Sequence, residues 1–85
     1  MKTIFKAKFE NNEIEIINSW RKGEQLFVNG VLQDEQLNFV SSNLSGHIIN
    51  FKGEKLMIKA QLSGFFTIGC RLFIDDQKVD IKKIA

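Results

Sequence analysis

The residues from Lys55 to Lys83 constrain the fold of this chain more than any other stretch, because their apolar side chains recur at every second position. Successive side chains of a β-strand point to opposite faces, so a period of two predicts strands with one buried face and one wet face. We expect three strands, over residues 55–62, 65–74 and 78–82. Their apolar positions are Leu56, Ile58, Ala60 and Leu62, then Phe66, Ile68, Cys70, Leu72 and Ile74, then Val79 and Ile81. This pattern is typical of an antiparallel sheet that covers a core.

The loops between these strands are constrained as well, because a slip of one residue would exchange the two faces of a strand. A loop of odd length after Leu62 places Leu62 opposite Phe66 and keeps the apolar positions on one face. At the following turn, which the two adjacent aspartates favour, an even loop places Ile74 opposite Val79.

Two further hairpins are expected in the N-terminal half. Alternation over residues 3–9 resumes at Ile14, and Asn tolerates positive φ, so Asn11-Asn12 is the expected turn with Phe9 opposite Ile14. The pair Asn29-Gly30 is the strongest local hairpin signal in the sequence, since it readily forms a type I′ turn. The adjacent Ile16 and Ile17 break the alternation, which indicates a bulge or a stretch covered on both sides.

The segment from Asp34 to Asn43 is ambiguous. It fits either a short helix capped by Asp34 or a strand in which Leu37 and Phe39 point inward, and we expect the strand. A turn at residues 41–43 and a strand from Leu44 to Phe51 should follow.

Turns spaced by about 8 to 12 residues are typical of β-sandwiches and barrels. We therefore predict one all-β domain spanning residues 1–85, an antiparallel sandwich or partly open barrel of about seven strands joined by short hairpins. A domain of this size buries only about 60–65 % of the surface of its unfolded chain, so most apolar residues are needed inside.

Charge and cysteine content limit the functional classes. The chain has 12 Lys and Arg against 10 Asp and Glu, a net charge of +2, with the two signs interspersed. This falls short of the concentrated basic surface expected of a protein that binds nucleic acid by neutralising phosphates. The single cysteine excludes an internal disulfide. Charges near the N-terminus recur too soon for a signal peptide, and no apolar run approaches membrane-spanning length, so we expect a cytoplasmic protein without membrane contact, unless the chain was trimmed from a longer precursor.

The chain contains few residues suited to catalysis or metal binding. With one histidine, His47, and one cysteine, Cys70, it has no obvious triad or zinc ligand set. His47 fits a half-buried or edge position, and Cys70 fits a buried inert thiol. Asp75 and Asp76 are explained by turn formation rather than by a calcium loop. We therefore expect no enzyme activity, no cofactor and no metal.

A binding surface is the remaining candidate site. The wetter face of the central strands combines cations with large apolar side chains: Lys55, Met57, Lys59, Phe65, Arg71 and Phe73. Such a face can be an ordinary solvated surface, or it can bind a partner through charge and stacking. Trp20, next to a polar turn, is a possible separate protein contact.

Taken together, these features predict a non-catalytic protein-interaction or accessory module that uses a sheet face or an edge strand, with another protein or a second copy as its partner. One alternative is an OB-like domain that binds single-stranded nucleic acid, favoured if residues 34–43 are helical. A second is a carrier of a small apolar ligand, which requires an interior cavity of several hundred Å³.

Overall fold

A computed structural model describes residues 2–37, 41–64 and 68–84 of the chain. Within these ranges the protein consists of strands and turns, without a helix. The strands are β1 (Lys2–Phe9), β2 (Asn12–Ser19), β3 (Gly23–Val28), β4 (Val31–Gln36), β5 (Ser41–Ile49), β6 (Lys55–Ser63), β7 (Gly69–Ile74), β8 (Gln77–Val79) and β9 (Lys82–Lys83). The predicted all-β class is confirmed, with nine strands rather than about seven.

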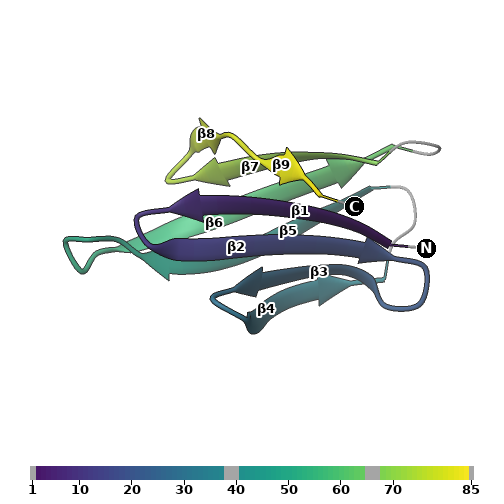
Figure 1. Cartoon of the computed structure of the whole chain (residues 1–85), viewed down its shortest axis with the longest axis horizontal. Helices are drawn as coiled ribbons and strands as arrows, with labels where there is room; N and C mark the ends of the chain where they lie inside the picture. Colours follow the sequence, from purple (N-terminus) through teal and green to yellow (C-terminus); the bar gives the residue numbers. More distant parts are fainter. Residues whose placement is uncertain (1, 38–40, 65–67, 85) are drawn as a thin grey trace.

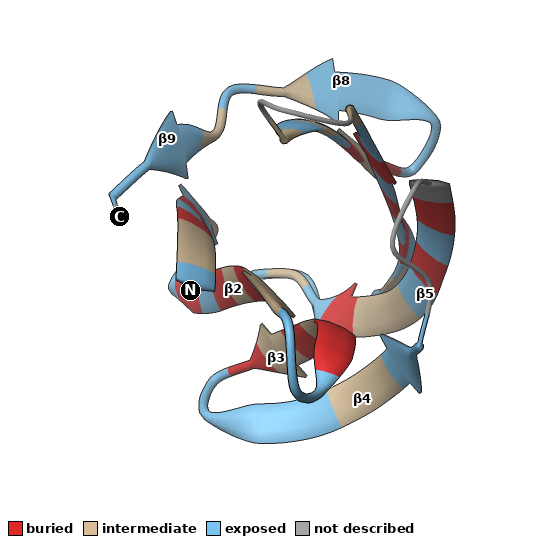
Figure 2. Ribbon diagram, turned by 90° about the vertical axis from the view of Figure 1, so that its right-hand side faces the viewer, coloured by how far each residue is buried: buried red, intermediate tan, exposed pale blue. Residues whose placement is uncertain are grey.

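Two antiparallel sheets make up the molecule (Figure 1). The first has the order β4-β3-β2-β1-β9 and the second the order β5-β6-β7-β8, so neither closes into a barrel. Figure 2 shows both sheets curling around a shared interior, with β4 next to β5 on one side and the chain crossing from β8 to β9 on the other. Apart from the crossings from β4 to β5 and from β8 to β9, each strand pairs with the next one along the chain.

The interior is filled by alternating side chains from both sheets, as the period of two requires. Thirteen hydrophobic residues are buried among those described: Phe5, Ala7, Ile14, Ile16, Leu26, Val28, Leu44, Ile48, Ile58, Ala60, Leu62, Leu72 and Ile74. Ile68 and Cys70 are partly buried and pack against this core. The described part of the C-terminal third therefore presents its apolar face inward, as its alternation predicts, and Phe66 lies outside the described residues.

The first hairpin turns one residue earlier than expected. Glu10 and Asn11 form the turn, both with positive φ (46° and 65°), and Phe9 pairs with Asn12 rather than with Ile14. Asn12 instead opens β2 with a buried side chain, whose Nδ2 donates to the carbonyl oxygen of Ile49 at 2.8 Å. The register moves by two residues, so apolar residues still face apolar residues across the two strands.

Two predicted pairings in the C-terminal third were also wrong. Leu62 pairs with Cys70 rather than Phe66, because the connection after β6 spans residues 64–68. That loop is odd, as predicted, but longer. Ile74 pairs with Gln77 rather than Val79, because residues 75–76 alone form the turn. Both loops keep the parity that was expected, and the faces of the strands are therefore preserved.

The middle of the chain contains one confirmed turn and several corrections. Val28 pairs with Val31 across Asn29-Gly30, as predicted. Asp34 lies in β4, which confirms a strand rather than a helix for its first residues, but Leu37 is 70 % exposed and does not point inward. Phe39 lies outside the described residues. The segment 41–43 opens β5 instead of forming a turn.

Of the two alternatives predicted at Ile16-Ile17, the bulge is absent, whereas the stretch covered on both sides fits the buried Ile16 and half-buried Ile17. Pairing of β2 with both neighbours is continuous there, and Ile17 is half-buried on the outer face. A bulge lies instead in β4, where Leu26 pairs with Asp34 and Phe27 with Leu32, leaving Gln33 as the extra residue. A bulge re-aims the side chains around it.

This bulge explains how β4 and β5 meet without a backbone ladder. Gln33 Oε1 accepts a hydrogen bond from the His47 N–H at 2.7 Å, and Asp34 Oδ2 accepts one from the Ser45 N–H at 2.8 Å. Gln36 Nε2 donates to the Asn43 carbonyl oxygen at 2.7 Å. Three backbone groups on the edge of β5 are thus satisfied by side chains, and this contact, the β4–β5 seam, closes one side of the sandwich.

Candidate functional site

The outer face of the four-stranded sheet is where most of the predicted binding residues come together. Strand alternation places one set of side chains in the core and the other in solvent, so the exposed positions of β6, β7 and β8 form a single surface. We call it the basic face; it comprises Lys55, Met57, Lys59, Gln61, Arg71, Phe73 and Lys78.

Cross-strand pairing fixes how these side chains are arranged. Lys59 lies opposite Phe73, and Phe73 lies opposite Lys78 on the next strand. Gln61 lies opposite Arg71. Directly opposed side chains on one face are about 4.5–5.5 Å apart at Cβ, so the half-buried ring of Phe73 is flanked by a lysine on each side.

The charge on this face is of one sign. Its outward strand positions carry Lys55, Lys59, Arg71 and Lys78, and no outward position in the described parts of β5 to β8 carries a carboxylate. One ion pair joins this face to a turn: Lys59 Nζ lies 3.5 Å from Asp76 Oδ1, and both side chains are exposed. Another exposed carboxylate, Asp80, directly follows β8. Such an exposed pair contributes little free energy, about 0–1 kcal/mol.

Apolar side chains extend the face towards β5. Met57 is 52 % exposed and pairs with His47, and Ile49 is 50 % exposed next to them. His47 is half-buried on this outer side, and its backbone N–H belongs to the β4–β5 seam. This agrees with the half-buried edge position predicted for it.

A hollow of about 620 Å³ lies at the Arg71 end of the basic face. The outward side chains that line it are polar or basic: Asn43, Gln61, Ser63, Arg71 and Lys78. The inward-facing Ser42, Leu62 and Cys70 also border it. Gly69 also lines it, and a Cβ atom at that position would meet nothing closer than the Ser63 carbonyl oxygen at 3.8 Å. Because Gly69 has no side chain, the surface of the sheet is open at this point, and Gly69 forms part of the floor of the hollow.

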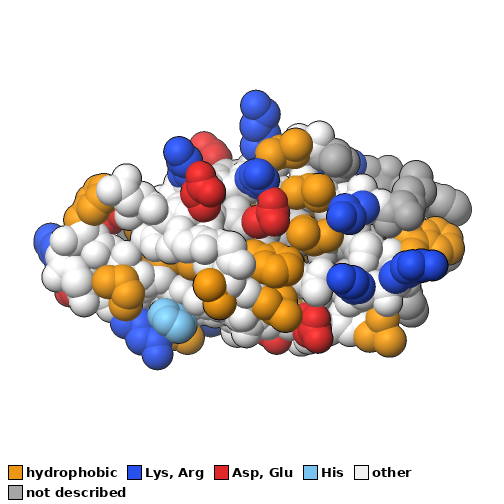
Figure 3. Space-filling model, turned by 60° about the horizontal axis from the view of Figure 1, so that its bottom comes forward, with side chains coloured by type: hydrophobic (Ala, Val, Ile, Leu, Met, Phe, Trp, Pro, Cys, Tyr) orange, Lys and Arg blue, Asp and Glu red, His pale blue; other side chains and the backbone are white. Residues whose placement is uncertain are grey.

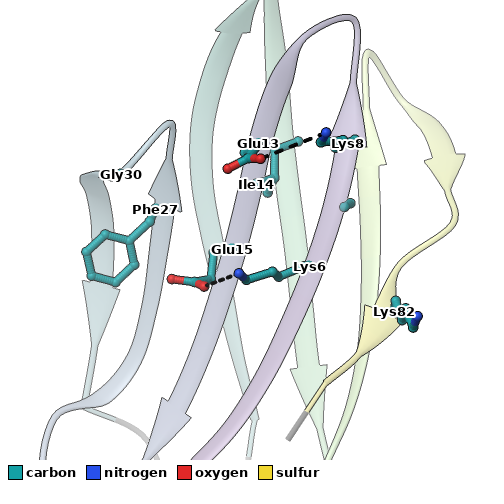
Figure 4. A pocket seen from close by; sticks show the side chains of 9 residues that line it. Lys6, Lys8, Glu13, Ile14, Glu15, Phe27, Gly30 and Lys82 are labelled. Atoms are coloured by element: carbon teal, nitrogen blue, oxygen red, sulfur yellow. Dashed lines mark ion pairs between the residues drawn. The ribbon is translucent and has the colours of Figure 1, made fainter.

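A second hollow, of about 330 Å³, lies on the outer face of the five-stranded sheet (Figure 4). Four of its five charged residues are paired across the strands: Lys6 Nζ lies 3.5 Å from Glu15 Oε2, and Lys8 Nζ lies 4.0 Å from Glu13 Oε1. The fifth is Lys82. Phe27 borders the same hollow. Paired opposite charges on adjacent strands are what a solvated sheet face requires, and they attract no particular partner.

Other exposed apolar residues are scattered over the molecule. Val31 and Leu32 on β4 are 64 % and 43 % exposed. On the side of the molecule shown in Figure 3, hydrophobic side chains form a broken band, and basic side chains lie at its right, its upper middle and its lower left. Trp20 is 74 % exposed in the turn between β2 and β3, so it does not belong to the basic face. Phe65 lies outside the described residues.

Cys70 is held away from reactive chemistry. It packs against the core, and burial raises the pKa of its thiol from 9.0 to about 12. A thiol must lose its proton to act as a nucleophile or metal ligand. Among the residues placed by the structure, no three His, Cys, Asp or Glu side chains are grouped so that they could hold a metal ion. The same residues contain no helix long and apolar enough to cross a membrane.

From the sequence, Gln61 and Lys78 were not assigned to the basic face, and the burial of Glu24 was not predicted. Gln61 shares the parity of Lys59 and could have been assigned to the face, but Lys78 joins it only through the two-residue turn at 75–76. Glu24 is buried on the inner side of β3 and accepts a hydrogen bond from Asn18 Nδ2 at 2.9 Å. Glu24 lies two residues before Leu26, so the alternation of β3 could have predicted that its side chain points inward.

Comparison with known proteins adds no assignment. No family model matches the chain, and neither the curated proteins nor the solved structures include a match.

Proposed function

We propose that this protein is a non-catalytic interaction module that binds an acidic surface of another protein through the basic face. The observation that carries the proposal is the one-sided charge of that face: four cations, no outward carboxylate in its described strands, and exposed apolar side chains among them. Charge complementarity of this kind directs association and selects partners.

A sheet face is favoured over an edge strand as the binding element. The edge of β5 already has backbone groups bonded by Gln33, Asp34 and Gln36. The edge strand β4 is joined to β5 by the same three side chains. The remaining edges are the short strands β8 and β9, of three and two residues, which carry Lys78, Lys82 and Lys83. Short, lysine-bearing edges are the usual protection against strand addition.

The alternative that we keep is binding of single-stranded nucleic acid. One observation favours it: Phe73 lies between Lys59 and Lys78, the combination of ring and cation that such proteins use. Asp34, however, lies in a strand rather than in the helix that would have favoured an OB-like domain, and the strand order is a meander rather than a five-stranded Greek key. The apolar-ligand carrier has less support, because core side chains from both sheets pack into the interior.

The test is a titration of ¹⁵N-labelled protein with a short peptide of alternating Glu and Leu, followed by amide chemical shifts at low and high salt. We expect shifts on β6 to β8 that weaken as salt rises. The charge-reversed pair Lys59→Glu with Arg71→Glu should abolish them. The matched control is Lys6→Glu with Lys8→Glu, which makes the same change in charge on the other sheet and should leave them intact.

Three outcomes would contradict the proposal. The first is an absence of salt-sensitive shifts, and the second is equal loss of binding in both double variants. The third is tighter binding of oligothymidylate than of the peptide, weakened by Phe73→Leu, which would replace the proposed function with nucleic-acid binding.

A further inference from the structure

The hollow at the Arg71 end of the basic face differs from the rest of that face in its chemistry. Four strands contribute to it: Asn43 from β5 pairs with Gln61 from β6, and Gln61 pairs with Arg71 from β7. Lys78 projects from β8 on the same side, diagonal to Arg71. Diagonal neighbours on a sheet face are about 7–8 Å apart, within reach of long side chains.

The polar side chains of this hollow have no partner within the described part of the chain. Asn43, Gln61, Ser63, Arg71 and Lys78 form no side-chain hydrogen bond or ion pair with another described residue. The one carboxylate bonded on this side, Asp76, is taken by Lys59. Two cations and three neutral groups able to donate hydrogen bonds therefore border the same space.

This set of donors suits an oxyanion. A guanidinium can bind both oxygens of a carboxylate at once, and an ammonium adds charge without fixed geometry. The amide nitrogens of Asn43 and Gln61 and the hydroxyl of Ser63 can donate to the same oxygens. The volume of about 620 Å³ also leaves room for the chain that carries the charged group.

The neighbouring side chains favour a protein over a nucleic acid as the source of that oxyanion. Phe73 is the only aromatic residue among the described outward positions of β6 to β8, and it is half-buried, which limits stacking. The exposed apolar residues at outward positions of β5 and β6 are the aliphatic Ile49 and Met57. Flexible and branched aliphatic side chains pack against other side chains rather than against bases.

We infer that the hollow formed by Asn43, Gln61, Ser63, Gly69, Arg71 and Lys78 is an anion site that binds a side-chain carboxylate of an acidic protein segment. This inference rests on the proposed function and locates its anchoring point. The remaining cations of the basic face, Lys55 and Lys59, then contribute through longer-range attraction.

The experiment compares two ways of disabling the hollow. The double variant Arg71→Gln with Lys78→Gln removes its charges, and Gly69→Val fills its floor without changing any charge. Gly69 is in an extended strand with open space outward, so Val is compatible with its backbone. The control is Lys55→Gln with Lys59→Gln, which removes the same charge from the same face outside the hollow.

Each variant is titrated with the Glu-Leu peptide and with its uncharged Gln-Leu counterpart. We expect the hollow variants to weaken Glu-Leu binding by about tenfold or more, as the loss of a charge-assisted hydrogen bond does. The control pair should weaken it by less than about threefold. The Gln-Leu peptide should bind weakly and equally to all variants. Unchanged amide spectra of the free variants verify that they fold.

The outcomes separate the site from the function. If Glu-Leu binding maps to the basic face but Gly69→Val and the Arg71 and Lys78 pair leave it unchanged, the anion site is wrong and the interaction module stands. If no peptide binds, both the proposed interaction module and the anion site are wrong. If oligothymidylate binds more tightly than the peptide and loses affinity in the hollow variants, the site binds phosphate and the inferred partner is wrong.

Discussion

Asn12 shows how a single buried amide can hold two sheets together. Its Nδ2 donates to the carbonyl oxygens of Phe9, Glu10 and Ile49, and its Oδ1 accepts a hydrogen bond from Asn29 Nδ2 at 3.0 Å. Ile49 belongs to the opposite sheet, so this amide connects two turns of one sheet with the end of a strand in the other.

Asn12→Ala should therefore lower the free energy of unfolding by about 1–3 kcal/mol, because it leaves polar groups at a partly buried site without partners. Urea denaturation followed by circular dichroism measures this change. Asn43→Ala is the control: that side chain is exposed and makes no hydrogen bond with the described residues, so its effect should stay within about 0.5 kcal/mol. Equal effects would show that the Asn12 amide does not stabilise the fold.

Cys70 gives a prediction about pH. Burial raises the pKa of its thiol from 9.0 to about 12, so the folded protein holds the proton more tightly than the unfolded chain does. The stability that this contributes is fully present below about pH 9 and is lost as the pH rises towards 12. The stability difference between the native protein and Cys70→Ala should shrink over that window.

Alkylation provides a second measurement of the same property. The native thiol should react with iodoacetamide far more slowly at pH 8 than the thiol of the urea-unfolded chain, because little thiolate is present in the fold. Equal rates would show that the side chain is open to solvent and titrates normally.

At the scale of elements, the β4–β5 seam depends on one glycine. A Cβ atom added to Gly46 would overlap Gln33 Oε1 and lie 2.9 Å from Leu26 Cδ2. The amide of Gln33 bonds the backbone of His47 next to it, so the added atom would displace both the seam and the core.

Gly46→Ala should cost about 1–3 kcal/mol of unfolding free energy through overpacking. Gly69→Ala, in another strand of the same sheet but with open space outward, should be neutral or slightly stabilising. Thermal unfolding of the two variants tests the difference. If Gly46→Ala leaves the free energy of unfolding unchanged, the side chains of the β4–β5 seam can move to make room for the added methyl group, and the seam is not tightly packed.

Sequence pattern predicted the faces of these strands better than their partners. Each wrongly predicted strand register differs from the observed one by an even number of residues; for example, Leu62 pairs with Cys70 instead of Phe66. An even shift leaves parity intact, so the basic face could be predicted while its pairings could not. The hollow depends on the registers of three neighbouring strand pairs, and the seam depends on a bulge at Gln33, which alternation does not reveal.

At the scale of the whole molecule, a small net charge conceals an asymmetry between the sheets. On the five-stranded sheet Lys6 and Lys8 each pair with a glutamate, whereas Arg71 and Lys78 on the other sheet have no such partner among the described residues. The field outside the protein should therefore be more positive over the basic face.

Cation-exchange chromatography at pH 7 tests this asymmetry. Arg71→Gln with Lys78→Gln and Lys6→Gln with Lys8→Gln both remove two of the 12 basic residues and bring the formal net charge from +2 to 0. The first pair should elute at markedly lower salt than the second, because it removes uncompensated charge. Identical elution would show that net charge alone governs the interaction and that the basic face has no special field.

The pairing of β9 with β1 has a consequence for how this protein is made. Lys82 and Lys83 pair with Lys6 and Phe5 of β1, which is synthesised well before them, and the Ile84 N–H donates a hydrogen bond to the Ile4 carbonyl oxygen at 2.8 Å. Contacts between residues so far apart in the chain form slowly, because the chain must lose the entropy of closing a large loop before the contacts stabilise it. Until then one side of β1 is an unpaired edge, and lysines such as those of β1 are the residue type that disfavours pairing of such an edge with another chain.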